Sequence, residues 1–295
     1  KKKKNGIRNN KRKCLHPKKK LKSRKRRIMN KIINTLFSAL LVLAVINPLA
    51  AQDDITVPLS KPGQKGMLRI DLVYADDIVV KTHNRQDVIV QYEGEDDRDN
   101  RNNRKDGLRR ISSGGLSLEI TEDNNVVKIS SQPQHNDLEL IVLVPKNFSL
   151  KLNAVHGDVA VDGLEGEVEI ESVNGDVEVF NISGSALVNS VNGDIEVSFT
   201  KTDPNAPMSF TGVNGDIEVS FPENAKFSAK MKTDWGDVYT NFDMEIDRSP
   251  TDTQVSSKKG QYKVSINKWV NGTVNGGGPE YLFKTLHGDI SIRKN

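Results

Sequence analysis

Cysteine is almost absent from this sequence. The single cysteine, Cys14, lies among lysine and arginine residues near the start of the chain, whereas a lipidated cysteine follows an apolar run. Beyond residue 51 the chain therefore has no thiol, no disulfide and no lipid anchor.

Acidic residues are absent from the first 51 positions, which carry 17 Lys or Arg residues. The remaining positions carry 26 basic and 39 acidic residues, so this part of the chain is net acidic. A net acidic surface repels the phosphates of nucleic acid. We therefore expect no nucleic-acid partner for the folded part of the chain.

An apolar run long enough to span a membrane is also absent. The apolar stretch at residues 36–46 is about half of the ~20 residues that a spanning helix needs. It follows the basic residues 1–28 and precedes the small pair Ala50 and Ala51, which is the order of a secretory signal peptide. We interpret residues 29–51 as a signal peptide, and the positions before it as a basic leader or a mis-assigned start. Cleavage would leave an exported chain, in the periplasm or on the cell surface, with no stable membrane span; an uncleaved anchor is the alternative.

Helical periodicity is missing beyond residue 51. Over residues 52–149, apolar and polar residues alternate in short runs, which predicts an N-terminal β-strand region. Residues 93–107 interrupt this pattern with mixed charge, and we expect a mobile charged loop there.

What the sequence does have is a repeat. A Gly-Asp step followed by Val or Ile occurs six times from residue 150 onward, and the first three copies are 18 residues apart. The steps are Gly157 and Asp158, Gly175 and Asp176, Gly193 and Asp194, Gly215 and Asp216, Gly236 and Asp237, and Gly288 and Asp289. We predict an all-β fold, a single-stack parallel β-solenoid (β-roll-like) of two-strand coils of about 18–22 residues. The repeat region covers residues 150–295, with an insertion at 244–278, and its last strands are expected to close the stack.

Apolar residues flank each step. The aliphatic residues two positions before the Gly are Val155, Val173, Val191, Val213 and Leu286. We expect them on the buried face, together with residues such as Val177 and Ile195 that follow the step. The residue directly before the Gly is often Asn, and Asn-Gly predicts a tight turn with positive φ. The Gly and Asp of each step are therefore predicted to be structural turn residues.

Several of these segments together resemble a known family. They are Leu-Val-Pro-Lys-Asn at 143–147, the Gly-Asp-Val copies, and the closing residues 276–280 and 286–290. They are similar to a bacterial adhesin family of β-strand repeats, also catalogued as the domain of unknown function DUF4097. The resemblance covers roughly residues 68–293 and implies a β-solenoid or β-roll in the cell envelope. It supplies no catalytic residues.

A column of carboxylates is the main candidate for metal binding. Stacked Asp158, Asp176, Asp194 and Asp216 could offer oxygen ligands to calcium. Calcium-binding rolls, however, repeat Gly-Gly-x-Gly-x-Asp every nine residues or so, and this chain has a single Gly at each step. The other interpretation is that each Asp accepts hydrogen bonds from backbone amides of its turn. We therefore predict no metal site and no cofactor, with calcium as the alternative.

Catalytic motifs are missing as well. The sequence has no Gly-x-Ser-x-Gly, no His-Glu-x-x-His, no phosphate loop and no dinucleotide glycine fingerprint. We predict a non-enzymatic envelope scaffold or adhesion module that binds an envelope or extracellular protein or a glycan. Trp235, which replaces the turn Asn, is a possible ligand contact. The alternatives are a periplasmic interaction or signalling partner that works by strand addition, and a polysaccharide-acting enzyme that uses paired carboxylates.

Overall fold

The computed structural model describes residues 54–94, 118–131, 138–247, 253–258, 261–266 and 269–295. The predicted leader and signal peptide lie outside these residues, as does most of the predicted charged loop. The loop was expected to begin at residue 93, but strand β3 (Asp87–Gly94) continues through that position. The described residues belong to one compact unit, so the regions before and after residue 150 belong together.

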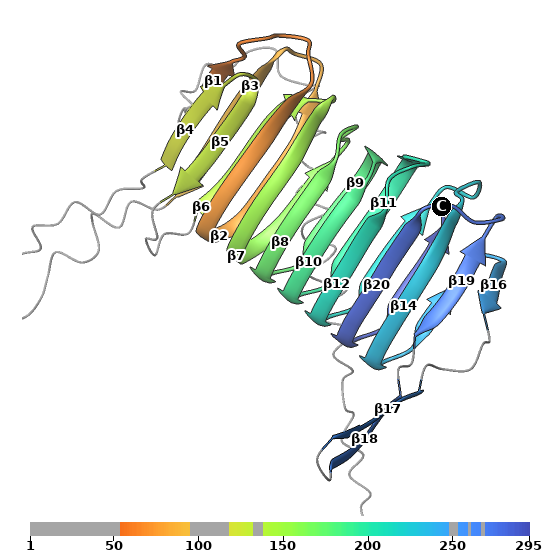
Figure 1. The fold of residues 1–295 in the computed structure, drawn as a ribbon. Helices are drawn as coiled ribbons and strands as arrows, with labels where there is room; N and C mark the ends of the chain where they lie inside the picture. The colour runs from red at the N-terminus through yellow and green to blue at the C-terminus, as the bar shows by residue number, and fades with distance from the viewer. Residues whose placement is uncertain (1–53, 95–117, 132–137, 248–252, 259–260, 267–268) are drawn as a thin grey trace, which may run out of the picture. The chain divides into compact units, whose positions relative to one another are not determined.

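The strands of this unit form two faces that enclose one core (Figure 1). Face A contains, in ladder order, β4 (Leu118–Asp123), β5 (Val126–Ser131), the first half of β2 (Gly66–His83), the first half of β7 (Phe148–Asp162), β8 (Val168–Asn174), β10 (Ala186–Asn192), β12 (Met208–Asn214), β20 (Glu280–His287), β14 (Phe227–Trp235), β19 (Val270–Val274) and β16 (Met244–Asp247). Face B contains β1 (Ile55–Pro58), β3, β6 (Leu138–Pro145), the second halves of β2 and β7, β9 (Val177–Gly184), β11 (Ile195–Thr202), β13 (Ile217–Phe221), β21 (Ile290–Lys294) and β15 (Val238–Thr240). Strands β17 (Thr253–Lys258) and β18 (Gln261–Ile266) pair with each other as a hairpin.

Alternation along each strand produces the core. In β8, Val168 and Ile170 are fully buried, whereas Glu169 and Glu171 point to the outside. Each buried aliphatic side chain contributes about 1.5–3 kcal/mol relative to exposure. Toward the C-terminal strands the core becomes aromatic, and Phe221 stacks on Tyr281 with a centroid distance of 5.3 Å. The all-β, solenoid-like class is therefore confirmed.

The strand directions are mixed, which corrects the prediction of a purely parallel stack. The central pairings, from β2 to β14, are parallel. At the ends, β4, β3 and β1 pair antiparallel, and so do β19 and β16. Strands β16 and β19 come from the predicted insertion at 244–278, so part of this segment covers the end of face A.

The order of coils in space differs from the order in the sequence. The coil of β20 and β21 lies between that of β12 and β13 and that of β14 and β15 (Figure 1). The amide of Gly215 donates to the carbonyl of His287 at 2.9 Å, and the amide of Gly288 donates to the carbonyl of Trp235 at 3.2 Å. The expectation that the C-terminal coil closes the stack is therefore wrong. Each Gly-Asp turn makes the same bond to its neighbour, so the turn motif does not specify which of these coils become neighbours.

Candidate binding face

The glycines of the repeat lie where neighbouring coils approach most closely. Gly193 has φ of 153°, and a Cβ added to it would lie 2.0 Å from the carbonyl oxygen of Gly175. The same clash, at 2.0 Å, would arise between Gly236 and the oxygen of Gly288. The need for glycine thus comes from contact between coils as well as from the turn.

The aspartates of the repeat form a ladder between coils. Oδ1 of each Asp accepts a hydrogen bond from the backbone amide of the Asp in the next coil. The amides of Asp176, Asp194, Asp216, Asp289 and Asp237 donate in this way to Asp158, Asp176, Asp194, Asp216 and Asp289, at 2.8–2.9 Å. These bonds join successive turns, whereas the interpretation from the sequence placed the accepted amides within the turn of each Asp. Among the described residues, no group of three or more His, Cys, Asp or Glu side chains is arranged to hold a metal ion.

The Asp ladder ends at Asp237, which directly precedes β15, the last strand of face B. There the Tyr239 hydroxyl donates to Asp237 Oδ2 at 3.3 Å. The charge of Asp237, followed by that of Asp289, raises the pKa of Tyr239 above its usual value.

The residues before each Gly form a second column at the turns. In ladder order these residues are His156, Asn174, Asn192, Asn214, His287 and Trp235, and Tyr74, which precedes Ala75, extends the column on β2. The Asn192 side-chain amide donates to Asn174 Oδ1 at 3.1 Å, and Asn214 donates to Asn192 Oδ1 at 2.8 Å. Trp235 is 72% exposed and stacks on His287 with a centroid distance of 6.2 Å. A ligand contact at Trp235 stays a prediction.

The aliphatic residues two positions before each Gly are exposed, which corrects the prediction that they are buried. Val155, Val173, Val191, Val213 and Leu286 are 36–40% exposed. Val173 and Val177 are four residues apart and would share a face if the strand continued without a break. The corner at Asn174 and Gly175 reverses the alternation, so Val177 points into the core and Val173 points outward. We call these five outward residues the aliphatic stripe.

The inward positions beside the stripe are occupied by small residues. Ala154, Ser172, Ser190 and Gly212 lie at equivalent positions on neighbouring strands of face A. The hydroxyls of Ser172 and Ser190 are buried, and neither has a hydrogen-bond partner in the described part of the chain. The equivalent Thr285 donates its hydroxyl to the carbonyl of Gly215 at 3.2 Å.

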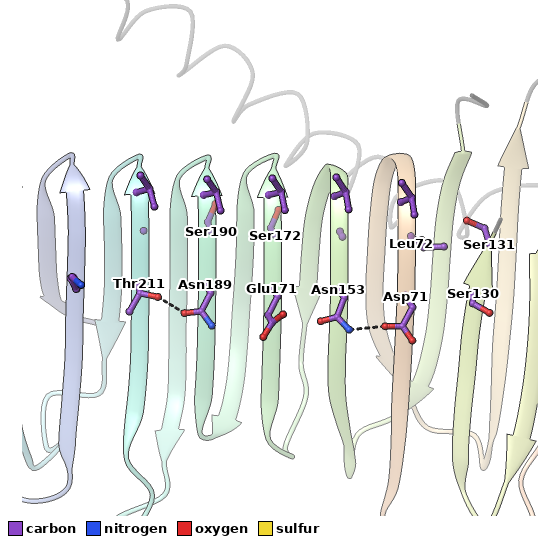
Figure 2. Close-up of a pocket in the computed structure, with 18 of the residues that line it drawn as sticks. Asp71, Leu72, Ser130, Ser131, Asn153, Glu171, Ser172, Asn189, Ser190 and Thr211 are labelled. Carbon is purple, nitrogen blue, oxygen red and sulfur yellow. Dashed lines mark hydrogen bonds between the residues drawn. The ribbon is translucent and has the colours of Figure 1, made fainter. Parts of the chain in front are cut away.

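A shallow trough of about 950 Å³ runs along the stripe, across the strands of face A (Figure 2). A row of polar side chains lies on the other side of this trough. In ladder order the polar row consists of Asp71, Asn153, Glu171, Asn189, Thr211 and Lys284. The charges of the polar row are separated by sign. The carboxylates of Asp71 and Glu171 lie on β2 and β8, and the ammonium group of Lys284 lies on β20. The neighbouring β14 adds Lys230 and Lys232, which lie 5.0 and 5.8 Å from the centre of the Trp269 ring.

Some members of the polar row already have partners. The Asn153 side chain donates to Asp71 Oδ1 at 2.6 Å, and Thr211 donates to Asn189 (Figure 2). Lys128 lies 3.9 Å from Asp71. Glu171 and Lys284 are exposed, and neither has an ion-pair partner among the described residues. The sequence contained both charges, but it did not indicate that they share a row beside an apolar stripe.

The sequence matches the Toastrack family, DUF4097, over residues 108–293, which is more than half of the chain. The chain belongs to the Toastrack family. The predicted resemblance is therefore confirmed, and it agrees with the repeated coils of the structure. The family is a domain of unknown function, so membership assigns no activity.

No curated protein matches the chain. One solved structure that resembles it is that of a protein from Clostridium sporogenes whose assignment to cell adhesion is provisional. The two sequences are 12% identical, and the match covers 82% of this chain and 99% of that chain. Its TM-score is 0.35, and a likeness at this level supports no conclusion about the present protein. No helix in the described residues is long and apolar enough to cross a membrane.

Proposed function

We propose that this Toastrack protein is an exported, non-catalytic binding module that holds another macromolecule against the outer surface of face A. The observation that carries the proposal is the aliphatic stripe. Five aliphatic side chains on adjacent strands of face A, from Val155 to Leu286, are each more than one third exposed. A contiguous apolar patch bordered by polar residues is typical of a macromolecular interface.

The scaffold holds the aliphatic stripe in a fixed conformation. The strand backbone is fixed by pairing on both sides, and the Asp ladder fixes the turns next to the stripe. The stripe therefore costs little conformational entropy when a partner covers it, because a valine side chain has one rotatable bond. A preorganised surface of this kind suits binding better than it suits a reaction that needs converging catalytic groups.

The exposed sheet edges fit the alternative of strand addition less well. Edge strand β1 ends in Pro58, and edge strand β4 carries Glu119, Glu122 and Asp123. Edge strand β15 has three residues. Proline, charge and short length are the usual means by which proteins prevent edge-to-edge pairing. These features favour a partner on the face of the sheet.

The proposal is tested by placing a photoreactive amino acid at single positions in cells that produce the protein. A probe at Val191, in the middle of the stripe, is expected to give a covalent adduct. The matched control is Ile246, an apolar residue of similar exposure on edge strand β16, which lies outside the stripe. Absence of an adduct from Val191, or equal adducts from both positions, would contradict the proposal.

A further inference from the structure

We infer that a second copy of this chain covers face A, related to the first by a two-fold axis that runs parallel to the strands between β10 and β12. The inference rests on the proposed function, because it names the partner of the same face. Its evidence is the division of charge along the polar row together with the aliphatic stripe beside it.

The two unpaired charges of the polar row have opposite signs. Glu171 lies on β8 and Lys284 on β20, and the strands between them are β10 and β12. Three strand spacings correspond to ~14 Å. The position midway between the two charges is therefore the gap between β10 and β12.

A two-fold axis at this midpoint satisfies both charges at once. The rotation places face A of one copy against face A of the other. The partner's strands then run across the interface in the opposite order, and each row of side chains faces the same row of the partner. Glu171 then lies opposite the partner's Lys284, and Lys284 lies opposite the partner's Glu171. Two symmetric ion pairs result, as an isologous interface requires.

The same operation aligns the aliphatic stripe with itself. Val173 lies opposite the partner's Leu286, and Val191 lies opposite the partner's Val213. The apolar contacts are thus central, and the ion pairs lie beside them. Two packed sheets are ~10 Å apart and rotated by about 30°, so contact is closest at these middle strands.

Charge complementarity distinguishes a second copy from other occupants. A uniformly anionic polymer would meet Lys284 but would be repelled by Glu171 and Asp71 at the other end of the row. A purely apolar ligand would leave Glu171 and Lys284 partly desolvated and unpaired, which is unfavourable. A surface whose charges are reversed along its own length is complementary to itself.

Analytical ultracentrifugation of the full chain and of three variants tests this arrangement. We expect the natural sequence to be a dimer. Glu171→Lys and Lys284→Glu each place two like-charged pairs in the interface, so each should raise the dimer Kd by ~10-fold or more. The double variant, Glu171→Lys with Lys284→Glu, restores both pairs in the opposite sense and should recover the dimer. The single effects should shrink at high salt.

Matched controls separate interface effects from misfolding. Val191→Asp should give a monomer that keeps the circular dichroism spectrum and the cooperative unfolding of the natural sequence, whereas Ile246→Asp should leave the dimer intact. A natural sequence that is monomeric at all concentrations, single variants as dimeric as the parent, or a double variant that stays monomeric would each overturn the inference. A monomer that still forms an adduct from Val191 with a different protein in cells would overturn the dimer and leave the proposed function standing.

Discussion

At the scale of single residues, glycine and aspartate have separate tasks at the same turn. The Gly allows two backbones to approach, since a Cβ at Gly175, Gly193 or Gly215 would lie 2.0–2.1 Å from the carbonyl oxygen of the preceding repeat glycine. The Asp then joins the coils, because its carboxylate accepts the amide of the next Asp. A repeated Gly-Asp step is therefore what stacking of coils requires, and no bound ion is needed to explain it.

We expect Gly193→Ala to reduce the free energy of unfolding by more than ~3 kcal/mol, because the new methyl group meets backbone atoms that cannot move aside. The matched control is Gly276→Ala, where φ is also positive, at 84°, but no atom lies within 4 Å of the added Cβ. That control should cost only ~1 kcal/mol, from the backbone conformation alone. Urea denaturation measures both, and equal costs would mean that contact between coils is not the reason for glycine.

Tyr281 gives a prediction about pH. Its side chain is buried in the aromatic part of the core, and burial raises the pKa of its hydroxyl above the usual value. The unfolded chain therefore releases this proton at a lower pH than the folded chain does. Stability from this group is complete below the usual tyrosine pKa of about 10 and decreases as pH rises above it. Chemical denaturation from pH 8 to 11 should show this decrease, and it should be smaller in Tyr281→Phe; an identical profile in the variant would contradict the assignment.

At the scale of strands, the corner decides which residues are buried. Val173 and Val177 are four residues apart, on either side of the same Asn-Gly corner, and an uninterrupted strand would place them on one face. In the structure Val173 is 37% exposed and Val177 is fully buried. Pattern analysis that continues the alternation through the corner places both inside. The turn changes the phase of the alternation, so the two halves of a coil must be analysed separately.

These two valines form a matched pair for mutation. Val177→Asp places a charge in the core and should destabilise the protein by on the order of 4 kcal/mol. Val173→Asp should change the free energy of unfolding of a single chain by no more than about 0.5 kcal/mol, because in one chain its side chain is in contact with solvent. Both variants are therefore compared with the natural sequence at concentrations too low for chains to associate. Thermal unfolding followed by circular dichroism distinguishes them, and a similar loss in both variants would show that the exposed assignment of Val173 is wrong.

The position of the C-terminal coil gives another prediction at this scale. Strand β15 pairs with β21, and β14 pairs with β20 and β19. Removal of residues 280–295 should therefore expose a gap inside the stack, and amide exchange should show that β14 and β15 lose protection along with β12 and β13. Replacing residues 253–266 with a short flexible linker is the control, since β17 and β18 pair with each other. Loss of protection at β14 alone would argue against the inserted position.

At the scale of the whole molecule, export is the property that the proposed function needs first. Residues 1–51 contain no acidic residue and combine a basic segment with a short apolar stretch, which is the order of a signal peptide. We expect the protein isolated from the producing cells to begin at Gln52 or Asp53. N-terminal sequencing checks this, and Ala51→Arg should prevent cleavage because the processing site requires a small residue. A mature protein that keeps residues 29–51 would contradict the interpretation as a cleaved signal.

The sequence by itself determined the local structure of this protein: its strands, its Gly-Asp turns and its acidic folded part. These properties depend on alternation and on turn chemistry, which are local in the chain. Only the tertiary structure decided which coils are neighbours and which face of each strand is buried next to a corner. The C-terminal coil could enter the stack because each Gly-Asp turn makes the same bond to its neighbour, and the aliphatic stripe became exposed because the corner reversed the alternation. For the same reason Glu171 and Lys284 became members of one row, although they are more than one hundred residues apart in the sequence.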